Sequence, residues 1–119
     1  MGYYSNVLIK VAGDSASVNQ LMAELLISSP VRYNTLVKRF DITTEDNLTT
    51  FRFNNNNVKW YTHFDEVTSI ESLWHYLEQT TTILNGIYIN IGEELCDIRV
   101  EHINDGFSLA EVSVNINEY

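Results

Sequence analysis

The sequence Phe51-Arg-Phe-Asn-Asn-Asn-Asn-Val-Lys-Trp-Tyr61 contains two alternating runs on either side of four asparagines. Alternation at period two is typical of half-buried strands, and asparagine tolerates the positive φ of tight turns. We therefore expect a hairpin centred on Asn55-Asn56, with one aromatic face and one cationic face. The expected cross-strand pairs are Phe53 with Val58, Arg52 with Lys59, and Phe51 with Trp60.

The size and composition of the chain predict one soluble domain. It has 119 residues, 45% of them hydrophobic and 19% charged, so we expect residues 1–119 to form a single domain with a real core. The start of the sequence does not resemble a signal peptide, and no apolar run approaches the ~18–20 residues that span a bilayer. Cys96 is the only cysteine, which favours a reducing cytoplasm.

The charge is distributed unevenly along the chain. The net charge is −9, which argues against direct binding to nucleic acid or to an anionic membrane. Residues 1–59 hold six cations and five acids, whereas residues 60–119 hold eleven acids and one cation, Arg99. The acidity therefore belongs to the second half.

Apolar periodicity predicts the elements before the asparagine run. We expect a strand over Tyr4–Val11, then a helix capped by Asp14 or Ser15, and a shorter helix that begins at Ser29-Pro30. A polar loop is expected over Thr43–Asn47. The two apolar stripes are Val18, Leu21, Met22, Leu25 and Leu26 in the first helix, and Tyr33, Leu36, Val37 and Phe40 in the second.

A third helix and three strands are expected after the asparagine run. The helix begins at Asp65 or Thr68, where Thr68 and Glu71 have the spacing of a capping box, and its core residues are Val67, Ile70, Leu73, Trp74 and Leu77. Asn85-Gly86 suits a left-handed helix end. The expected strands are Ile87–Ile91, followed by Cys96–Ile103 and Phe107–Asn117, which pair around Asn104-Asp105-Gly106.

This order predicts an α+β fold with the ferredoxin-like, split β-α-β arrangement: an antiparallel sheet, helices on one face, and an extra C-terminal β-hairpin. The other face of the sheet is then expected to be open. The out-of-phase residues that would line this open face are Tyr88, Asn90, Lys10, Arg52, Lys59 and Tyr61.

No catalytic or metal site is predicted. The possible ligands Glu93, Glu94, Cys96, Asp97 and His102 lack the spacing of a zinc signature. Acidic neighbours disfavour a thiolate at Cys96, and the isolated glycines form no phosphate-binding loop. We therefore expect neither an enzyme nor a bound cofactor.

The acidic second half is the strongest candidate for a binding surface. Solvated turns would explain its acids individually, but their accumulation favours a surface directed at a basic partner. We predict that this surface consists of Glu93, Glu94, Asp97, Glu101 and Asp105. One alternative is a nucleotide or small-anion site on the open sheet face, formed by Arg52, Lys59 and Tyr61, and another is a homo-oligomeric structural component.

Three segments together resemble a group of small bacteriophage and prophage proteins: Met-Gly-Tyr-Tyr-Ser at the start, Val58-Lys-Trp-Tyr61, and Ile87-Tyr-Ile-Asn-Ile-Gly-Glu-Glu-Leu-Cys-Asp-Ile98. These are mainly packing and turn residues, and no catalytic residue transfers from that group to this sequence. The resemblance implies an acidic protein that acts in the host cytoplasm by binding a host protein. The expected function is inhibition or modulation of that protein, possible targets being CRISPR-type or other nucleic-acid-handling defence factors.

Overall fold

The computed structural model describes residues 4–61, 64–80, 84–92 and 98–104. These residues form three helices and five strands. In chain order the elements are β1 (Ser5–Asp14), α1 (Ser15–Ser28), α2 (Pro30–Arg39), β2 (Asp41–Glu45), β3 (Leu48–Val58), α3 (Asp65–Thr80), β4 (Asn85–Gly92) and β5 (Ile98–Ile103).

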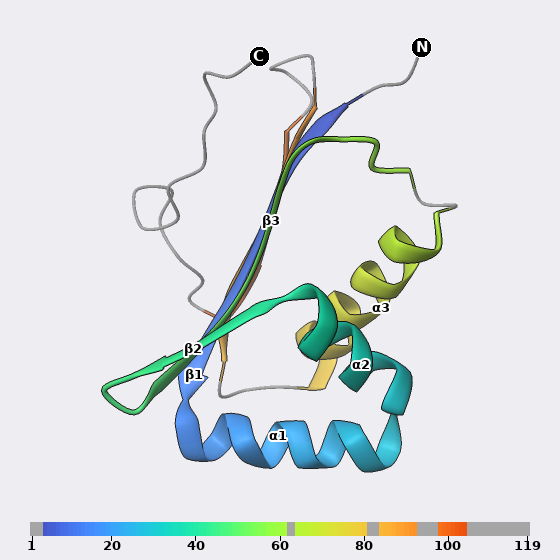
Figure 1. The fold of residues 1–119 in the computed structure, drawn as a ribbon. Helices are drawn as coiled ribbons and strands as arrows, with labels where there is room; N and C mark the ends of the chain where they lie inside the picture. The colour runs from blue at the N-terminus through green and yellow to red at the C-terminus, as the bar shows by residue number, and fades with distance from the viewer. Residues whose placement is uncertain (1–3, 62–63, 81–83, 93–97, 105–119) are drawn as a thin grey trace.

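The five strands form one sheet in the order β2-β3-β1-β4-β5, and every neighbouring pair is antiparallel. The three helices lie on the same side of this sheet, which Figure 1 shows nearly edge-on. The fold is therefore α+β with a five-stranded antiparallel sheet, which confirms the coarse prediction.

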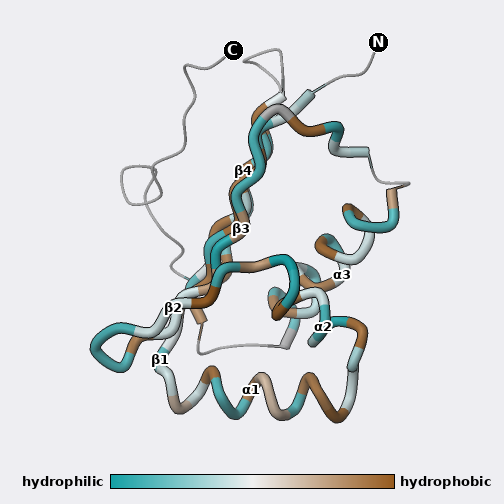
Figure 2. Tube along the Cα trace, viewed as in Figure 1, coloured by the Kyte–Doolittle hydropathy of each residue, from teal (hydrophilic) through white to brown (hydrophobic). Residues whose placement is uncertain are grey.

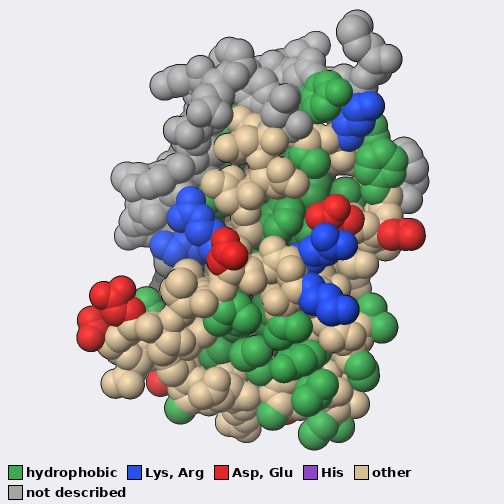
Figure 3. Space-filling model, in the orientation of Figure 1, with side chains coloured by type: hydrophobic (Ala, Val, Ile, Leu, Met, Phe, Trp, Pro, Cys, Tyr) green, Lys and Arg blue, Asp and Glu red, His purple; other side chains and the backbone are tan. Residues whose placement is uncertain are grey.

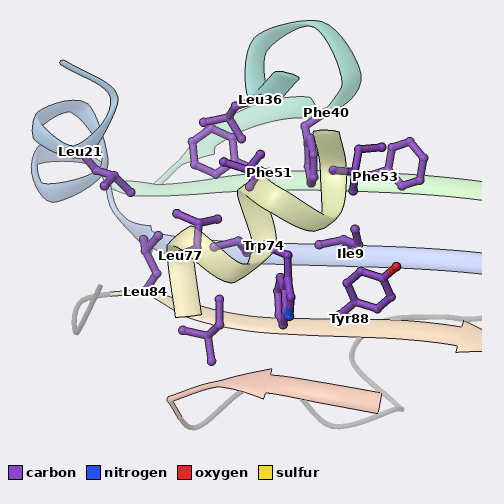
Figure 4. Packing of buried hydrophobic residues seen from close by; sticks show 14 of the residues in the cluster. Ile9, Leu21, Leu36, Phe40, Phe51, Phe53, Trp74, Leu77, Leu84 and Tyr88 are labelled. Carbon is purple, nitrogen blue, oxygen red and sulfur yellow. The ribbon is translucent and has the colours of Figure 1, made fainter. Parts of the chain in front are cut away.

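The main core lies between the helices and the sheet (Figure 4). It confirms the predicted stripe of α3, because all five expected residues are buried. Asp14 begins α1 as expected, since its carboxylate accepts a hydrogen bond from the Ser17 amide at 2.9 Å. Leu26 differs from the prediction: it is 51% exposed, and the buried residues of α1 are Val18, Leu21 and Leu25.

The predicted hairpin at the asparagine run is wrong. β3 continues through Asn54–Val58, and Asn54 and Asn55 pair with Leu8 and Val7 of β1. Pairing with the central strand overrides the turn preference of asparagine, because strand propensity depends strongly on tertiary context. Phe51 and Phe53 are buried as expected, but Arg52 lies opposite Lys10 and not Lys59.

The actual hairpin joins β2 and β3 through Asp46 and Asn47. Both residues have positive φ, 52° and 64°, as a two-residue type I′ turn requires. The expected polar loop over Thr43–Asn47 is thus the end of an edge strand and its turn. This turn is hydrophilic in Figure 2.

Two local predictions around α3 are also wrong. The amide of Thr68 donates to the Phe64 carbonyl at 2.9 Å, so Thr68 lies inside the helix and forms no capping box with Glu71. Asn85-Gly86 lies in β4 and is not a helix end. Gly86 is needed for close packing, because a Cβ at this position would lie 3.3 Å from the Trp74 ring and 3.1 Å from Ile103.

The second face of the sheet is buried over part of β1 and β4, which corrects the predicted open face there, whereas Lys10 and Arg52 lie on this face as expected and are partly exposed. Leu8, Ile87, Ile89 and Ile91 form a separate buried cluster there, each at most 1% exposed. Tyr88 has the opposite orientation, toward the helices, and belongs to the main core. Its ring packs against Trp74 with the centroids 5.5 Å apart, which explains why the tyrosine and not the isoleucines faces α3.

The rest of the C-terminal prediction concerns residues beyond those described. β5 confirms a strand over Ile98–Ile103, and Asn104 has a positive φ of 54°. Cys96 and the expected strand Phe107–Asn117 lie outside the described residues.

Candidate functional site: an acidic rim between α3 and β5

Glu71 is the centre of a polar network that joins α3 to the sheet. It follows Ile70 on α3, and its side chain is 15% exposed. The Arg99 guanidinium donates to both carboxylate oxygens, from Nη1 to Oε1 at 2.7 Å and from Nη2 to Oε2 at 3.1 Å. The Tyr88 hydroxyl donates to Oε1 at 2.8 Å. A two-pronged arginine contact of this kind fixes geometry as well as charge.

Arg99 and Glu101 reach this network because side chains alternate along β5. Arg99 Nε donates to Glu101 Oε2, and Trp74 Nε1 donates to Glu101 Oε1 at 3.2 Å. The guanidinium carbon of Arg99 lies 4.4 Å from the centre of the Tyr88 ring. One cation is therefore shared between two carboxylates and an aromatic face.

Tyr88 is a fully buried donor and acceptor in the network. Its hydroxyl accepts a hydrogen bond from Trp60 Nε1 at 2.8 Å and donates to Glu71. Burial, reinforced by the charge of Glu71, raises the pKa of Tyr88 well above its ordinary value of 10. Tyr88 therefore stays protonated at neutral pH and acts as a fixed hydrogen-bond donor.

The ionised forms of the two partners on β5 are stabilised. For Glu101, burial opposes ionisation, but hydrogen bonds from Arg99 and Trp74 outweigh it and hold the pKa of the carboxyl below its ordinary value. For Arg99, burial is again opposed by Glu71 and Glu101, and the pKa of the guanidinium is raised. Both groups are charged throughout the physiological range.

His75 and Glu78 extend the network toward solvent along α3. His75 Nδ1 lies 3.0 Å from Glu78 Oε1, and its Nε2 lies 3.8 Å from Glu71 Oε2. We call Glu71, His75, Glu78, Arg99 and Glu101 together the acidic rim. A shallow cavity of about 360 Å³ at this rim is lined by Thr68, Glu71, His75 and Arg99.

The acidic rim holds three carboxylates against one guanidinium. The hydrogen bonds of Arg99 are directed at Glu71 and Glu101, so its charge is balanced within the rim. The side chain of His75, which is 56% exposed, is the part of the rim most open to solvent. A rim of this composition attracts cations more readily than anions.

The predicted acidic surface overlaps this rim at one residue. Glu101 is described and belongs to the rim, but its carboxylate already accepts hydrogen bonds from Arg99 and Trp74. The remaining members, Glu93, Glu94, Asp97 and Asp105, lie outside the described residues. Glu71 and Glu78 are not among the predicted site residues, because no local pattern indicates that α3 and β5 meet along this edge.

The alternative anion site is not assembled. Arg52 lies on β3 between Asp41 of β2 and Lys10 of β1. Lys59 and Tyr61 follow the far end of the same strand, and seven extended residues separate Arg52 from Lys59 by ~23 Å. Lys59 Nζ lies 5.7 Å from the centre of the Tyr4 ring. Arg52 and Lys59 are therefore too far apart to hold one small anion.

Among residues 4–61, 64–80, 84–92 and 98–104, no three His, Cys, Asp or Glu side chains are grouped as metal ligands would be. Within the same ranges, no helix combines the length and the apolar character needed to cross a membrane.

Comparison of the chain with models of protein families, with curated proteins and with solved structures found no match.

Proposed function

We propose that the protein is a non-enzymatic binding protein that uses its acidic rim to capture a partner with a basic surface. The observation that carries this proposal is the composition of the rim: it holds three carboxylates and one guanidinium, and Glu71 and Glu101 already balance that guanidinium. Excess negative charge at one edge favours association with a positively charged surface and accelerates it.

The composition of the connection between β4 and β5 also favours a basic partner. In the sequence, residues 93–97 join these two strands and include Glu93, Glu94 and Asp97 but no cation. The five-residue connection starts and ends at strands next to the rim, since Ile91 pairs with Ile98. We propose that these acids take part in the same interaction with a basic partner.

The resemblance to small phage proteins suggests the identity of the partner. We propose a phage-encoded protein that acts in the cytoplasm of its host and inhibits or modulates a host protein. A nucleic-acid-handling defence factor, of the CRISPR type or another, would offer the basic surface that the acidic rim requires. No chemistry is assigned to the rim, because Tyr88 and Arg99 are held in fixed protonation states and already hydrogen-bonded.

We also infer that the framework is ferredoxin-like, with β5 as an addition. The order β2-β3-β1-β4 supports this inference, as do the helical connections from β1 to β2 and from β3 to β4. The analogy is one of fold alone and adds nothing about function.

Charge reversal combined with affinity capture from host lysate tests the proposed function. The charge-reversal variant, called the rim variant, carries Glu78→Lys in the rim and Glu94→Lys in the acidic connection, and it leaves Glu71 and Glu101 to hold the fold. A control variant carries Glu24→Lys and Glu118→Lys and has the same net charge. We expect the rim variant to lose the captured protein and the control to retain it. Equal capture by the two variants would contradict the proposal.

A further inference from the structure

We infer that β2 is a docking edge for an extended, basic polypeptide segment, which would add to the sheet as a further antiparallel strand. β2 is the outermost strand of the sheet beside β3. All five of its residues, Asp41–Glu45, are exposed. Figure 1 shows the β2–β3 hairpin extending beyond the body of the protein. This surface is separate from the acidic rim, and the inference does not rest on the proposed function.

The turn determines which backbone groups β2 presents. Asp46 and Asn47 form the two-residue turn, and Glu45 and Leu48 flank it as a directly opposed pair. In a type I′ hairpin this closing pair exchanges hydrogen bonds, and such pairs alternate along an antiparallel ladder. The N–H and C=O groups of Ile42 and Thr44 therefore point away from β3. They form a template for one more strand.

The charge of the hairpin selects the kind of strand that fits this template. Residues 41–50 include Asp41, Glu45 and Asp46 but no lysine or arginine. Acidic side chains gather at the tip of the hairpin in Figure 3. Asp41 and Glu45 lie on the same face of β2. Arg52 of β3 lies opposite Asp41, whereas Leu48 lies opposite Glu45, so a lysine or arginine of an added strand would meet Glu45 first.

The same charges disfavour a second copy of this chain as the occupant. Two β2 strands paired antiparallel about Thr43 would place Asp41 of each opposite Glu45 of the other. Directly opposed like charges destabilise a strand pair. Ile42, which is 40% exposed on the other face of β2, would contact an apolar residue between the cations of the added strand.

The test uses a synthetic heptapeptide of alternating lysine and valine and the full-length, ¹⁵N-labelled protein. Amide chemical shifts are followed during the titration. We expect the largest changes at Ile42 and Thr44, and we expect no binding of the matching heptapeptide in which glutamate replaces lysine. Changes centred on α3 and β5 would assign the peptide to the acidic rim and overturn the inference, while leaving the proposed function intact.

Two substitutions at Thr44 separate the backbone from the side chain. Thr44→Pro removes an outward N–H without breaking a hydrogen bond to β3, and proline is tolerated on this side of an edge strand. We expect it to weaken the lysine peptide at least about tenfold, whereas Thr44→Val, which keeps the N–H, should bind like the wild type. Equal binding by both variants would contradict the inference.

A charge variant provides a second test that does not depend on proline. Glu45→Lys, at an exposed position beside the turn, should weaken the lysine peptide and strengthen the glutamate peptide. If neither affinity changes, the charge selection inferred for β2 is wrong.

Discussion

Arg99 of β5 donates two hydrogen bonds to Glu71 of α3, and this contact joins the last described strand to the last helix. The two residues are 28 positions apart, and the pair also positions Tyr88 and Glu101. The acidic rim depends on this contact for its shape. The Arg99 guanidinium also offsets the repulsion between the partly buried carboxylates of Glu71 and Glu101.

Arg99→Met should lower the free energy of unfolding by about 1–3 kcal/mol, because Glu71 would keep its charge and lose its partner. Urea unfolding measures this change. The double variant with Glu71→Gln should lose less than the sum of the single variants. Arg39→Met is the control, because Arg39 is half-exposed and its ion pair with Glu66 is long, at 3.7 Å. We expect this variant to change the free energy of unfolding by less than about 0.5 kcal/mol. Additive effects of Arg99→Met and Glu71→Gln would contradict the coupling described here.

Tyr88→Phe should destabilise the protein by about 1–2 kcal/mol, because Trp60 Nε1 loses its acceptor and Glu71 loses a donor. Tyr33→Phe, on the half-buried face of α2, serves as the control. Since the pKa of Tyr88 is raised in the folded state, its contribution is present below pH 10 and is lost as the pH rises above that value. Tyr88→Phe should therefore lessen the loss of stability at alkaline pH, which thermal melts measure. An equal alkaline loss in wild type and Tyr88→Phe would contradict a buried, hydrogen-bonded Tyr88 hydroxyl.

Asparagine-to-valine substitutions distinguish the observed hairpin from the one expected at Asn55-Asn56. Asn47 has a φ of 64°, which a β-branched residue adopts only with strain, so Asn47→Val should cost about 1–2 kcal/mol. Asn55 lies in β3 opposite Val7, where valine suits a strand, so Asn55→Val should be neutral or stabilising. If thermal unfolding shows Asn55→Val to be the more destabilising of the two variants, the result would favour a turn at the asparagine run.

Glu101→Gln should show a pH-dependent loss of stability. The pKa of Glu101 is below its ordinary value of 4.5 in the folded state, so its ionised form contributes stability above about pH 4.5. This contribution is lost as the pH falls through the folded-state pKa. The difference in melting temperature between wild type and Glu101→Gln should therefore shrink on acidification. The exposed Glu24→Gln is the control, and a difference for Glu101→Gln that grows below pH 4 would contradict the assignment.

The helical half of the fold could be predicted from the sequence because its signals are local. The stripe of α3 repeats with the helical period from Val67 to Leu77, and Asp14 is a strong cap before α1. The positions of the strands could be predicted less well than those of the helices. Asn54 and Asn55 have a turn composition but pair with β1. The true turn, Asp46-Asn47, lies between Thr43-Thr44-Glu45 and Leu48-Thr49-Thr50, which show no clear apolar alternation.

The acidic rim could be predicted only in part, since it depends on contacts between distant segments. The excess of acids in the second half was visible in the sequence, and Glu101 was among the predicted residues. Nothing local indicates that Glu71 faces β5 or that Tyr88 faces α3. The alternation of Ile87, Ile89 and Ile91 suggested that the isoleucines face the helices. In the structure both faces of β4 are buried, so alternation does not identify the face that meets α3.

The measurement that tests the proposed function most directly is affinity capture from host lysate at about 50 and about 300 mM salt. Charges that attract across an exposed interface are screened more strongly at the higher salt concentration. We predict that the wild-type chain captures a basic host protein at low salt, that high salt reduces the capture severalfold, and that the variant with Glu78→Lys and Glu94→Lys captures little at either concentration. Capture that is equally strong at both salt concentrations and in both proteins would contradict an acidic interface.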